Sequence, residues 1–209
     1  GRLLDKLEEL GRDRDTVIIF TSDNGGLSTL FPGRAAPTSN LPLRAGKGWC
    51  YEGGIRVPLI IRVPGAGNDA VSDFPVISTD FYPTILDLAG LSPAPGLVLD
   101  GLSLGSLIRE GVPPEREALF WHYPHYHGSA WTPGAAVRCG NWKLIEFYDK
   151  EKVELYNLKD DLGEKLELSG QYPERTAELL EMLHDWQRST GALMPRLNPR
   201  RHPGPGNLQ

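Results

Sequence analysis

The fold of this chain is decided by ten consecutive residues, Val17-Ile18-Ile19-Phe20-Thr21-Ser22-Asp23-Asn24-Gly25-Gly26. An apolar, β-branched run over 16–21 predicts a buried strand. The run stops at polar side chains, and open α/β folds bind ligands at this carboxyl edge of the sheet. Asp23 and Asn24 offer adjacent hard oxygens, which suit Ca²⁺ or Mg²⁺. The alternative is an ordinary strand followed by a glycine turn, because Asn-Gly is a common hairpin signal.

The segments on either side of this strand predict an α/β layer. Apolar periodicity and capping residues indicate two helices and two further strands: helices over 2–10 and 78–89, and strands over 57–62 and 75–77. Between them lies a loop from about 24 to 55 that is rich in Gly, Pro, Ser and Asn. Loops of this length inside a compact domain are usually functional or disordered.

The second half of the chain predicts a small α+β subdomain. Four short strands are expected, with turns that favour an antiparallel meander: 117–122, 135–139, 142–148 and 153–158. A helix over 173–190 places Leu179, Leu180, Leu183 and Trp186 on one stripe, which predicts that it packs on the sheet. The expected domains are therefore 1–112 for the α/β part, 113–194 for the subdomain and 195–209 for a Pro-rich, extended or disordered tail.

Composition narrows the classes of function. The 209 residues are 40% hydrophobic and 23% charged, with 22 basic against 27 acidic residues. This balance argues against a nucleic-acid partner, and no apolar run is long enough to span a membrane. Cys50 and Cys139 could form one disulfide, although two free thiols are favoured. Because the chain starts inside a helical pattern, we expect it to be a fragment.

A glycine-rich segment in the long loop predicts an anion site. Gly46 and Gly48 let the backbone approach a ligand closely, and Lys47 between them projects a compact cation. Glycine with lysine can form a phosphate or sulfate cradle, but the spacing of a Walker P-loop is missing. Arg44 is a further candidate for the anion, or else a solvated loop arginine.

Several motifs in order resemble the C-terminal part of a sulfatase, in the arylsulfatase group of the alkaline-phosphatase-like superfamily. The matching segments are Phe20–Gly25, Gly46–Gly48, Tyr51–Pro58, Asp80–Leu86, Leu88–Gly90, Asp100–Leu104, Val137–Leu144 and Glu154–Leu158. The likeness extends to about residue 190 and covers nearly the whole chain. It implies the C-terminal part of an alkaline-phosphatase-like α/β core followed by a four-stranded antiparallel sheet with a C-terminal helix.

The resemblance also implies site residues. Asp23 and Asn24 would be two ligands of a divalent cation, which is Ca²⁺ in this family. Lys47 would contact the sulfate group and offset the negative charge that builds up during S–O cleavage. The nucleophile would be a formylglycine made from Cys or Ser in a Cys/Ser-x-Pro-x-Arg segment. Its hydrate attacks sulfur, and the sulfated intermediate then eliminates sulfate.

The chain departs from the family in two respects. No Cys or Ser is followed two residues later by Pro, so the nucleophile segment is missing. The paired N-terminal aspartates that complete the metal site are also missing, and Asp160-Asp161 is better interpreted as a turn with a solvated charge pair. The chain would therefore carry half an active site and be inactive without the N-terminal remainder of the enzyme.

Other polar and aromatic residues have a structural and a functional interpretation. The segment from His122 to His127 could supply zinc ligands, but no zinc pattern surrounds it. The resemblance instead suggests that His125 binds the substrate or protonates the leaving group; a plain surface loop is the alternative. Glu52 and Arg56 are expected to brace the loop by pairing with each other or with backbone. The aromatic residues Trp49 and Tyr51 are expected to pack on the core.

Three functions remain open on the sequence alone. The first is sulfuric ester hydrolysis by the complete protein, on a sulfated small molecule or carbohydrate. The second is a phosphatase or phosphodiesterase of the same superfamily, which would have two metals and a histidine directly after Asp23, where this chain has Asn24. The third is a non-catalytic anion-binding module. A periplasmic or secreted location is what the resemblance implies.

Overall fold

The computed structural model describes residues 1–29, 35–66 and 70–196. These residues form two compact units, one comprising 1–25 with 56–119 and the other comprising 26–55 with the chain from 120 onward. The long loop thus belongs to the same unit as the antiparallel sheet. The domain limits expected from the sequence place this loop in the α/β part, 1–112. The predicted limits at 112 and 194 stay predictions, and the predicted tail falls largely outside the described residues.

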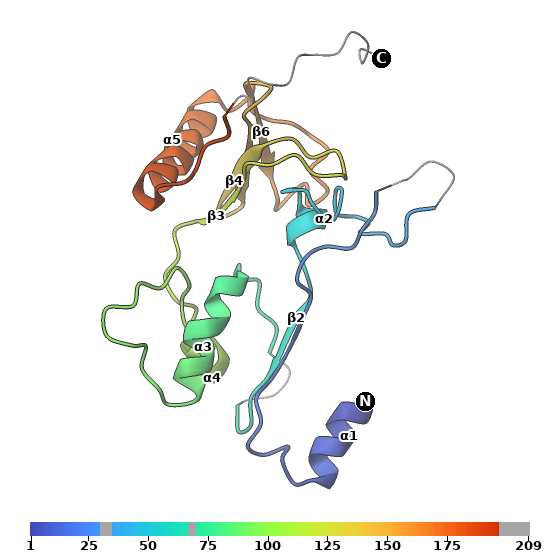
Figure 1. Ribbon diagram of the computed structural model, residues 1–209, viewed down its shortest axis with the longest axis vertical. Helices are drawn as coiled ribbons and strands as arrows, with labels where there is room; N and C mark the ends of the chain where they lie inside the picture. Colours follow the sequence, from blue (N-terminus) through green and yellow to red (C-terminus); the bar gives the residue numbers. More distant parts are fainter. Residues whose placement is uncertain (30–34, 67–69, 197–209) are drawn as a thin grey trace. The chain divides into compact units, whose positions relative to one another are not determined.

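The first unit contains helices and a two-stranded sheet (Figure 1). Its elements are α1 (Arg2–Glu9), β1 (Ile18–Thr21), β2 (Leu59–Arg62), η1 (Ser78–Asp80), α3 (Phe81–Leu88) and α4 (Gly105–Glu110). β1 and β2 are antiparallel, with Phe20 opposite Ile60. The predicted helices over 2–10 and 78–89 and the predicted strands over 16–21 and 57–62 are confirmed to within a few residues.

Two expectations for this unit are wrong. β1 is not a fully buried strand, because it pairs only with β2 among the described residues and Phe20 is 61% exposed. Residues 75–77 do not form a strand. Ile77 is extended, but its N–H is donated to the Asp80 carboxylate at 2.9 Å rather than to a neighbouring strand. An extended backbone without a ladder partner is a connection, not a strand.

The second unit contains a four-stranded antiparallel sheet in the order β3-β4-β5-β6, as the sequence predicts. The strands are β3 (Leu119–Tyr123), whose first residue belongs to the first unit, β4 (Gly134–Cys139), β5 (Trp142–Phe147) and β6 (Lys152–Asn157). The C-terminal helix α5 (Pro173–Thr190) starts with a proline and ends at Gly191, which adopts a left-handed conformation with φ of 64°. The bounds of this helix match the prediction.

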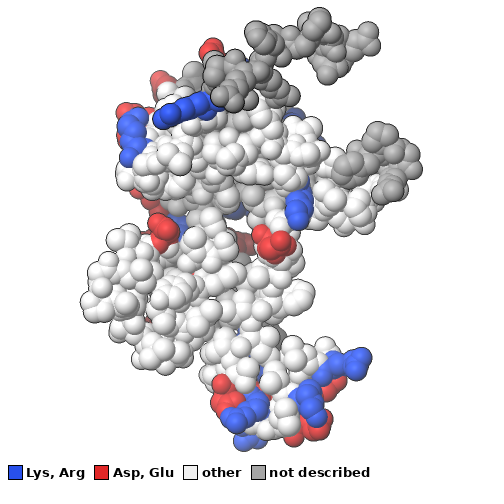
Figure 2. Space-filling view, in the orientation of Figure 1, with Lys and Arg blue, Asp and Glu red and all other residues white. Residues whose placement is uncertain are grey.

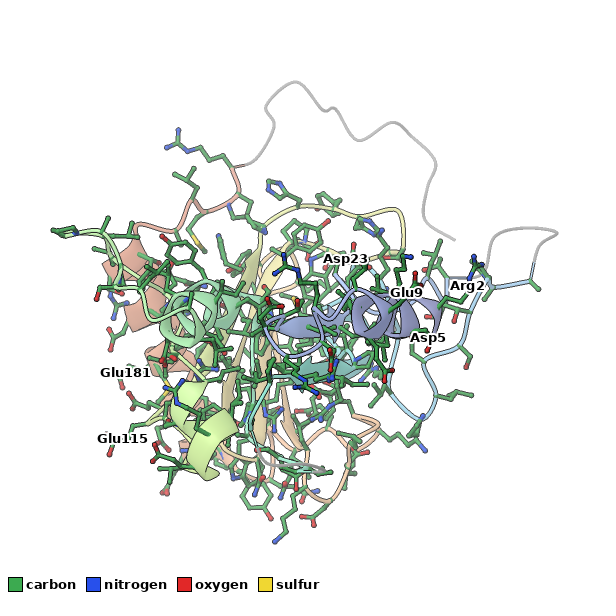
Figure 3. The ribbon with its side chains drawn as sticks, turned by 90° about the horizontal axis from the view of Figure 1, so that it is seen from below. Arg2, Asp5, Glu9, Asp23, Glu115 and Glu181 are labelled. Carbon is green, nitrogen blue, oxygen red and sulfur yellow. The ribbon has the colours of Figure 1, made fainter. Side chains whose placement is uncertain are left out.

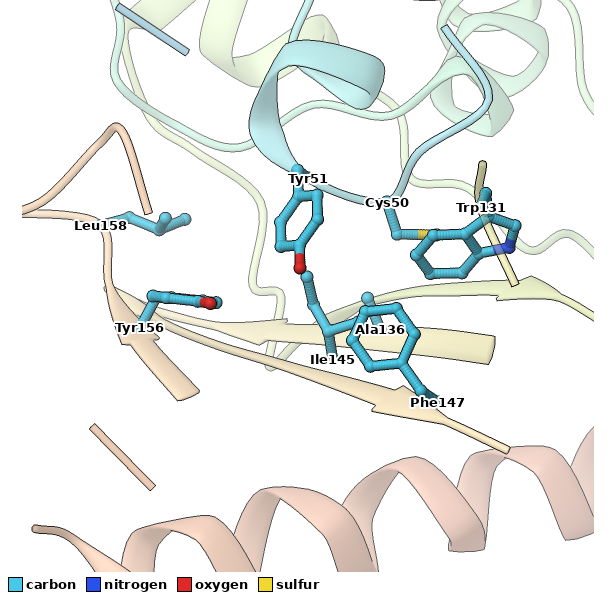
Figure 4. Packing of buried hydrophobic residues seen from close by; sticks show 8 residues of the cluster. All are labelled: Cys50, Tyr51, Trp131, Ala136, Ile145, Phe147, Tyr156 and Leu158. Carbon is cyan, nitrogen blue, oxygen red and sulfur yellow. The ribbon is translucent and has the colours of Figure 1, made fainter. Parts of the chain in front are cut away.

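Both faces of the sheet are covered, which explains why its strands show little polar alternation. One face packs on α5, where Leu179 and Leu183 are fully buried. The other face receives the long loop, and Figure 4 shows Cys50 and Tyr51 of this loop over Ile145 and Phe147 of β5. A short helix in the loop, α2 (Glu52–Ile55), begins directly after Tyr51. The loop is therefore part of the core of this unit.

Three further features of the described residues bear on the class of protein: the cysteines, the surface charges and the character of the helices. Both cysteines are free thiols, as favoured, with Cys50 buried and Cys139 half-buried. Side chains of both signs lie together on α1 (Figure 2). No helix in the described ranges has both the length and the apolar character needed to cross a membrane.

Candidate functional site

The predicted cation ligands follow β1 directly. Asp23 is exposed and carries a label in Figure 3, and Asn24 is half-buried. The backbone carbonyl of Asn24 accepts a hydrogen bond from Ser22 Oγ at 2.8 Å, which shapes the turn. Among the described residues, no group of three or more His, Cys, Asp or Glu side chains could hold a metal. The two hard oxygen donors suit Ca²⁺, but they are two where six to eight oxygens are typical.

Lys47 lies at the surface of a tightly fixed turn. Its N–H donates to the Gly26 carbonyl at 3.1 Å, and the side chain is exposed. Asn40 fixes the same turn, because its Nδ2 donates to the carbonyls of Gly26 at 2.8 Å and Ala45 at 3.0 Å. A Cβ on Gly46 would lie 2.3 Å from the Gly26 carbonyl oxygen, so only glycine fits there. Sequence reasoning found Lys47 and its glycines but missed Asn40.

His127 lies against the residue that follows Lys47. A Cβ on Gly48 would lie 2.1 Å from His127 Nδ1, and Gly48 has a φ of 86°. His127 Nδ1 also faces Ser129 Oγ at 2.7 Å and accepts from the Ser129 N–H at 3.2 Å. The structure therefore brings His127 to the lysine turn, while the predicted His125 is exposed beside the Tyr123 ring, with centroids 6.0 Å apart. The functional role of His125 stays a prediction.

Arg44 points into the sheet unit. Its guanidinium lies 3.9 Å above the Tyr51 ring, and Nη1 donates to Tyr156 Oη at 2.7 Å and to the Glu164 carbonyl at 2.8 Å. Burial acts to lower the pKa of Arg44, but Tyr51, Tyr156 and Glu154 together keep that pKa above its ordinary value. These contacts stabilise the loop. The predicted contact of Arg44 with the anion stays a prediction.

Glu154 of β6 joins the loop to the sheet. Its Oε2 accepts hydrogen bonds from Tyr51 Oη at 2.6 Å and Tyr156 Oη at 2.8 Å, and its Oε1 pairs with Lys152 at 2.7 Å. Burial acts to raise the pKa of Glu154, but the hydrogen bonds from Lys152, Tyr51 and Tyr156 bring that pKa below its usual range. The carboxylate is therefore ionised at neutral pH and fixes both phenols.

The aromatic and charged neighbours of the lysine turn are mainly structural. Tyr51 is buried and stacks on Trp49 with ring centroids 5.5 Å apart, which confirms the expected packing on the core. Glu52 is buried and pairs with Lys143 at 2.9 Å, a brace from the sheet that the sequence did not reveal. Burial raises the pKa of Cys50 to about 12, so this thiol stays neutral and is a poor nucleophile.

Asp160-Asp161 and His122, which the sequence also singled out, make contacts that stabilise the fold. Asp161 Oδ2 accepts the backbone N–H groups of Lys165 at 2.6 Å and Leu166 at 2.8 Å, so Asp160-Asp161 is a turn, as expected. Asp161 is half-buried in that turn rather than freely solvated. His122 lies between Tyr148 Oη at 2.9 Å and the Leu193 carbonyl at 3.0 Å, contacts that suit a packed imidazole.

Comparisons with known proteins agree with this architecture. The family model of the C-terminal region of N-sulphoglucosamine sulphohydrolase matches residues 45–189. A sulfatase of Formosa agariphila is 39% identical over 192 residues, which cover 83% of this chain and 34% of that protein. The N-acetylglucosamine-6-O-sulfatase of Bacteroides thetaiotaomicron is 32% identical over 200 residues, which cover 90% of this chain and 33% of that protein.

A solved structure also matches most of this chain. It is a complex with its substrate D-glucosamine-2-N,6-O-disulfate, and it matches with a TM-score of 0.69 and 29% identity over 91% of this chain and 38% of that one. The fold is therefore that of the C-terminal part of an alkaline-phosphatase-like α/β enzyme. The chain belongs to the sulfatase family. It spans about a third of the length of the curated relatives, 34% and 33% for the two above.

Proposed function

We propose that the chain is the C-terminal part of an enzyme that hydrolyses sulfuric esters, with sulfated carbohydrates as the natural substrate class. Family membership supports the reaction. The names of two similar proteins support the substrate class, since one is an N-acetylglucosamine-6-O-sulfatase and the other holds a glucosamine disulfate. Aryl sulfates are expected to serve as chromogenic substitutes, because the reaction occurs at sulfur rather than at the alcohol.

The observation that carries this proposal is the presentation of Lys47. Its ammonium is exposed at the tip of a turn whose backbone is fixed by Asn40, Gly26 and Gly46. A cation held by a rigid turn can offset charge on a sulfate oxygen without reorganising in the transition state. His125, exposed on the neighbouring loop, is proposed to contact the substrate or protonate the leaving group, and His127 orders the turn through Gly48.

The proposal assigns the rest of the reaction to the N-terminal remainder of the enzyme. Asp23 and Asn24 supply two oxygen ligands for Ca²⁺, and the remainder supplies the other ligands and the formylglycine. When present, that residue supplies the covalent nucleophile for sulfuryl transfer. The short span relative to the curated relatives supports this division. A periplasmic or extracellular location is proposed from the family resemblance.

The role of Lys47 can be tested in the full-length enzyme with an aryl sulfate. Lys47→Ala is expected to lower kcat by roughly 10²–10³, the range found on removing one oxyanion-stabilising donor. Lys159→Ala is the matched control, because Lys159 is an exposed lysine of the same unit in the turn after β6, and it should leave the rate unchanged. An unchanged rate in Lys47→Ala would refute the proposed role.

The division of the active site can be tested with the 209-residue chain itself. No turnover of the aryl sulfate is expected, and calorimetry should show weak or no Ca²⁺ binding because two ligands rarely suffice. Tight Ca²⁺ binding would show that this chain completes the site by itself. Faster hydrolysis of the matching aryl phosphate by the full-length enzyme would favour the phosphatase alternative. If the full-length protein binds sulfate but hydrolyses no ester, the alternative of a non-catalytic anion-binding module is favoured.

A further inference from the structure

A buried group of three charged side chains lies beneath the lysine turn. Lys143 of β5 is fully buried, and its Nζ lies 2.9 Å from Glu52 Oε1 and 2.8 Å from Glu164 Oε1. Both carboxylates are buried as well. Buried ion pairs are costly to desolvate, and apolar residues of similar volume are often at least as stabilising. The two carboxylates and one ammonium therefore need an explanation other than stability.

The group connects both sides of the lysine turn to the sheet. Glu52 lies five positions after Lys47 and opens α2. Glu164 Oε2 accepts the N–H of Glu52 at 2.7 Å, and the Glu164 carbonyl accepts from Arg44, three positions before Lys47, at 2.8 Å. Lys143 thus fixes Glu164 and Glu52 together, and through them it fixes the backbone that enters and leaves the turn.

Close backbone packing transmits the position of α2 to Lys47. The N–H of Gly53 donates to the Arg44 carbonyl at 2.8 Å, and a Cβ on Gly53 would lie 2.3 Å from that oxygen. A Cβ on Gly54 would lie 2.0 Å from the Trp49 carbonyl oxygen and 2.6 Å from that of Gly46. There is no free space in which α2 could shift while the turn stays in place.

We propose that Lys143 is a positioning residue of the anion site, which holds the turn that presents Lys47 by pairing with Glu52 and Glu164. The inference rests on the proposed function, in which Lys47 contacts the sulfate group. A charged pair fixes direction as well as distance, whereas an apolar contact would let α2 slide on the sheet. Lys143 is separated from the surface by the loop itself and acts through the backbone of residues 44–54.

Hydrogen–deuterium exchange of the 209-residue chain, followed by NMR, tests the structural half of the proposal. Lys143→Met keeps the length and removes the charge. It is expected to raise exchange at the amides of Lys47, Trp49, Gly53 and Gly54 at least tenfold and to leave the β4–β5 ladder protected. Lys159→Met is the matched control, since Lys159 is an exposed lysine in the turn after β6. Unchanged exchange in the turn, or an equal rise throughout the sheet, would overturn the proposal.

A double-mutant cycle in the full-length enzyme tests the functional half. Lys143→Met alone is expected to lower kcat on an aryl sulfate by 10- to 100-fold. In a Lys47→Ala background it should have little further effect, because the side chain that it positions is already gone. Equal losses in both backgrounds would make Lys143 a merely structural residue and refute the inference. If Lys47→Ala alone leaves the rate intact, the proposed function is refuted instead. The exchange measurement then still tests whether Lys143 holds the turn.

Discussion

The two compact units of this chain are built differently. In the second unit the sheet is covered on both faces, and the loop that carries Lys47 is held by buried hydrogen bonds and ion pairs to β5 and β6. In the described part of the first unit the large buried apolar side chains are only Leu104 and Leu119. Apolar side chains of α1, β1, β2 and α3 are instead exposed there: Leu3, Leu4, Phe20, Ile60 and Ile85.

This difference separates the two halves of the candidate site. The proposed anion-binding turn around Lys47 is pre-organised, because packed aromatic residues and buried charges support its backbone. The cation half consists of Asp23 and Asn24 after a strand with an exposed apolar face. Functional side chains need a rigid supporting layer to hold their geometry. The turn proposed to bind the anion is therefore held rigidly, whereas the proposed cation ligands follow a strand with an exposed apolar face.

The first unit has one strong internal connection, and breaking it should have the largest effect. Asp80 is fully buried and forms a two-bond ion pair with Arg116, while its carboxylate also accepts the N–H groups of Ile77 and Leu102. Asp80→Ala leaves a buried guanidinium without its partner. We expect a loss of about 3–5 kcal/mol in the free energy of unfolding of this unit. Urea denaturation, with amide exchange in α3 as a local probe, measures it.

The matched control is the exposed ion pair between Arg109 and Asp87, at 2.7 Å. Arg109→Ala should cost no more than about 1 kcal/mol, because exposed pairs are screened by solvent. Protection of the β4–β5 ladder should not change in either variant. Loss of protection in β4 and β5 of Asp80→Ala would show that the units unfold as one, and the comparison drawn above would be wrong.

Two leucines on amphipathic helices, one in each unit, differ in their exposure. Leu179 of α5 is fully buried and Leu3 of α1 is 69% exposed, although the sequence predicts an apolar face for both helices. Leu179→Ala is expected to cost about 2–5 kcal/mol in the stability of the second unit. Leu3→Ala should change stability by less than about 0.5 kcal/mol in this chain. Thermal unfolding followed by circular dichroism measures both, and a comparable cost for Leu3→Ala would show that its face is covered in solution.

These leucines show what the sequence could predict and what it could not. The period of the leucines predicts where each helix lies, because periodicity reflects the face that a helix packs against other residues. It does not reveal whether that packing partner is present in this chain. Likewise, the apolar run of β1 predicts a strand, while the exposure of Phe20 depends on what lies beside it.

The candidate site shows the same limit for polar residues. Lys47 and its glycines could be predicted because a local motif contains them. The contacts of Asn40, Lys143 and Glu164 could not be predicted, because the tertiary fold decides them: Asn40 folds back on Gly26 and Ala45, and Lys143 and Glu164 reach Glu52 from distant parts of the chain. Lys143 in particular lies in a predicted strand, but the strand pattern does not show that its ammonium is fully buried beside Glu52 and Glu164. Tertiary contacts between distant segments decide such roles.

The smallest expected effect concerns the pH dependence of the second unit. The pKa of Glu154 is lowered in the folded protein, so ionisation of this carboxylate stabilises the fold above its unfolded pKa of about 4.3, and that stabilisation is lost as pH falls through the folded pKa. Glu154→Gln should therefore cost about 1.5–3 kcal/mol at neutral pH, the range for hydrogen bonds to a charged group. The difference from the unmodified chain should shrink towards zero in acid.

Urea denaturation across acidic to neutral pH measures this difference, and the amides of Gly53 and Gly54 report the loop directly. Glu151→Gln is the control, because Glu151 is an exposed carboxylate in the turn before β6. Its substitution should change neither the stability nor its pH dependence. A cost for Glu154→Gln that stays constant down to strong acid would mean that the negative charge of Glu154 does not stabilise the loop. The loop would then be held by packing and by the ion pairs of Lys143 with Glu52 and Glu164.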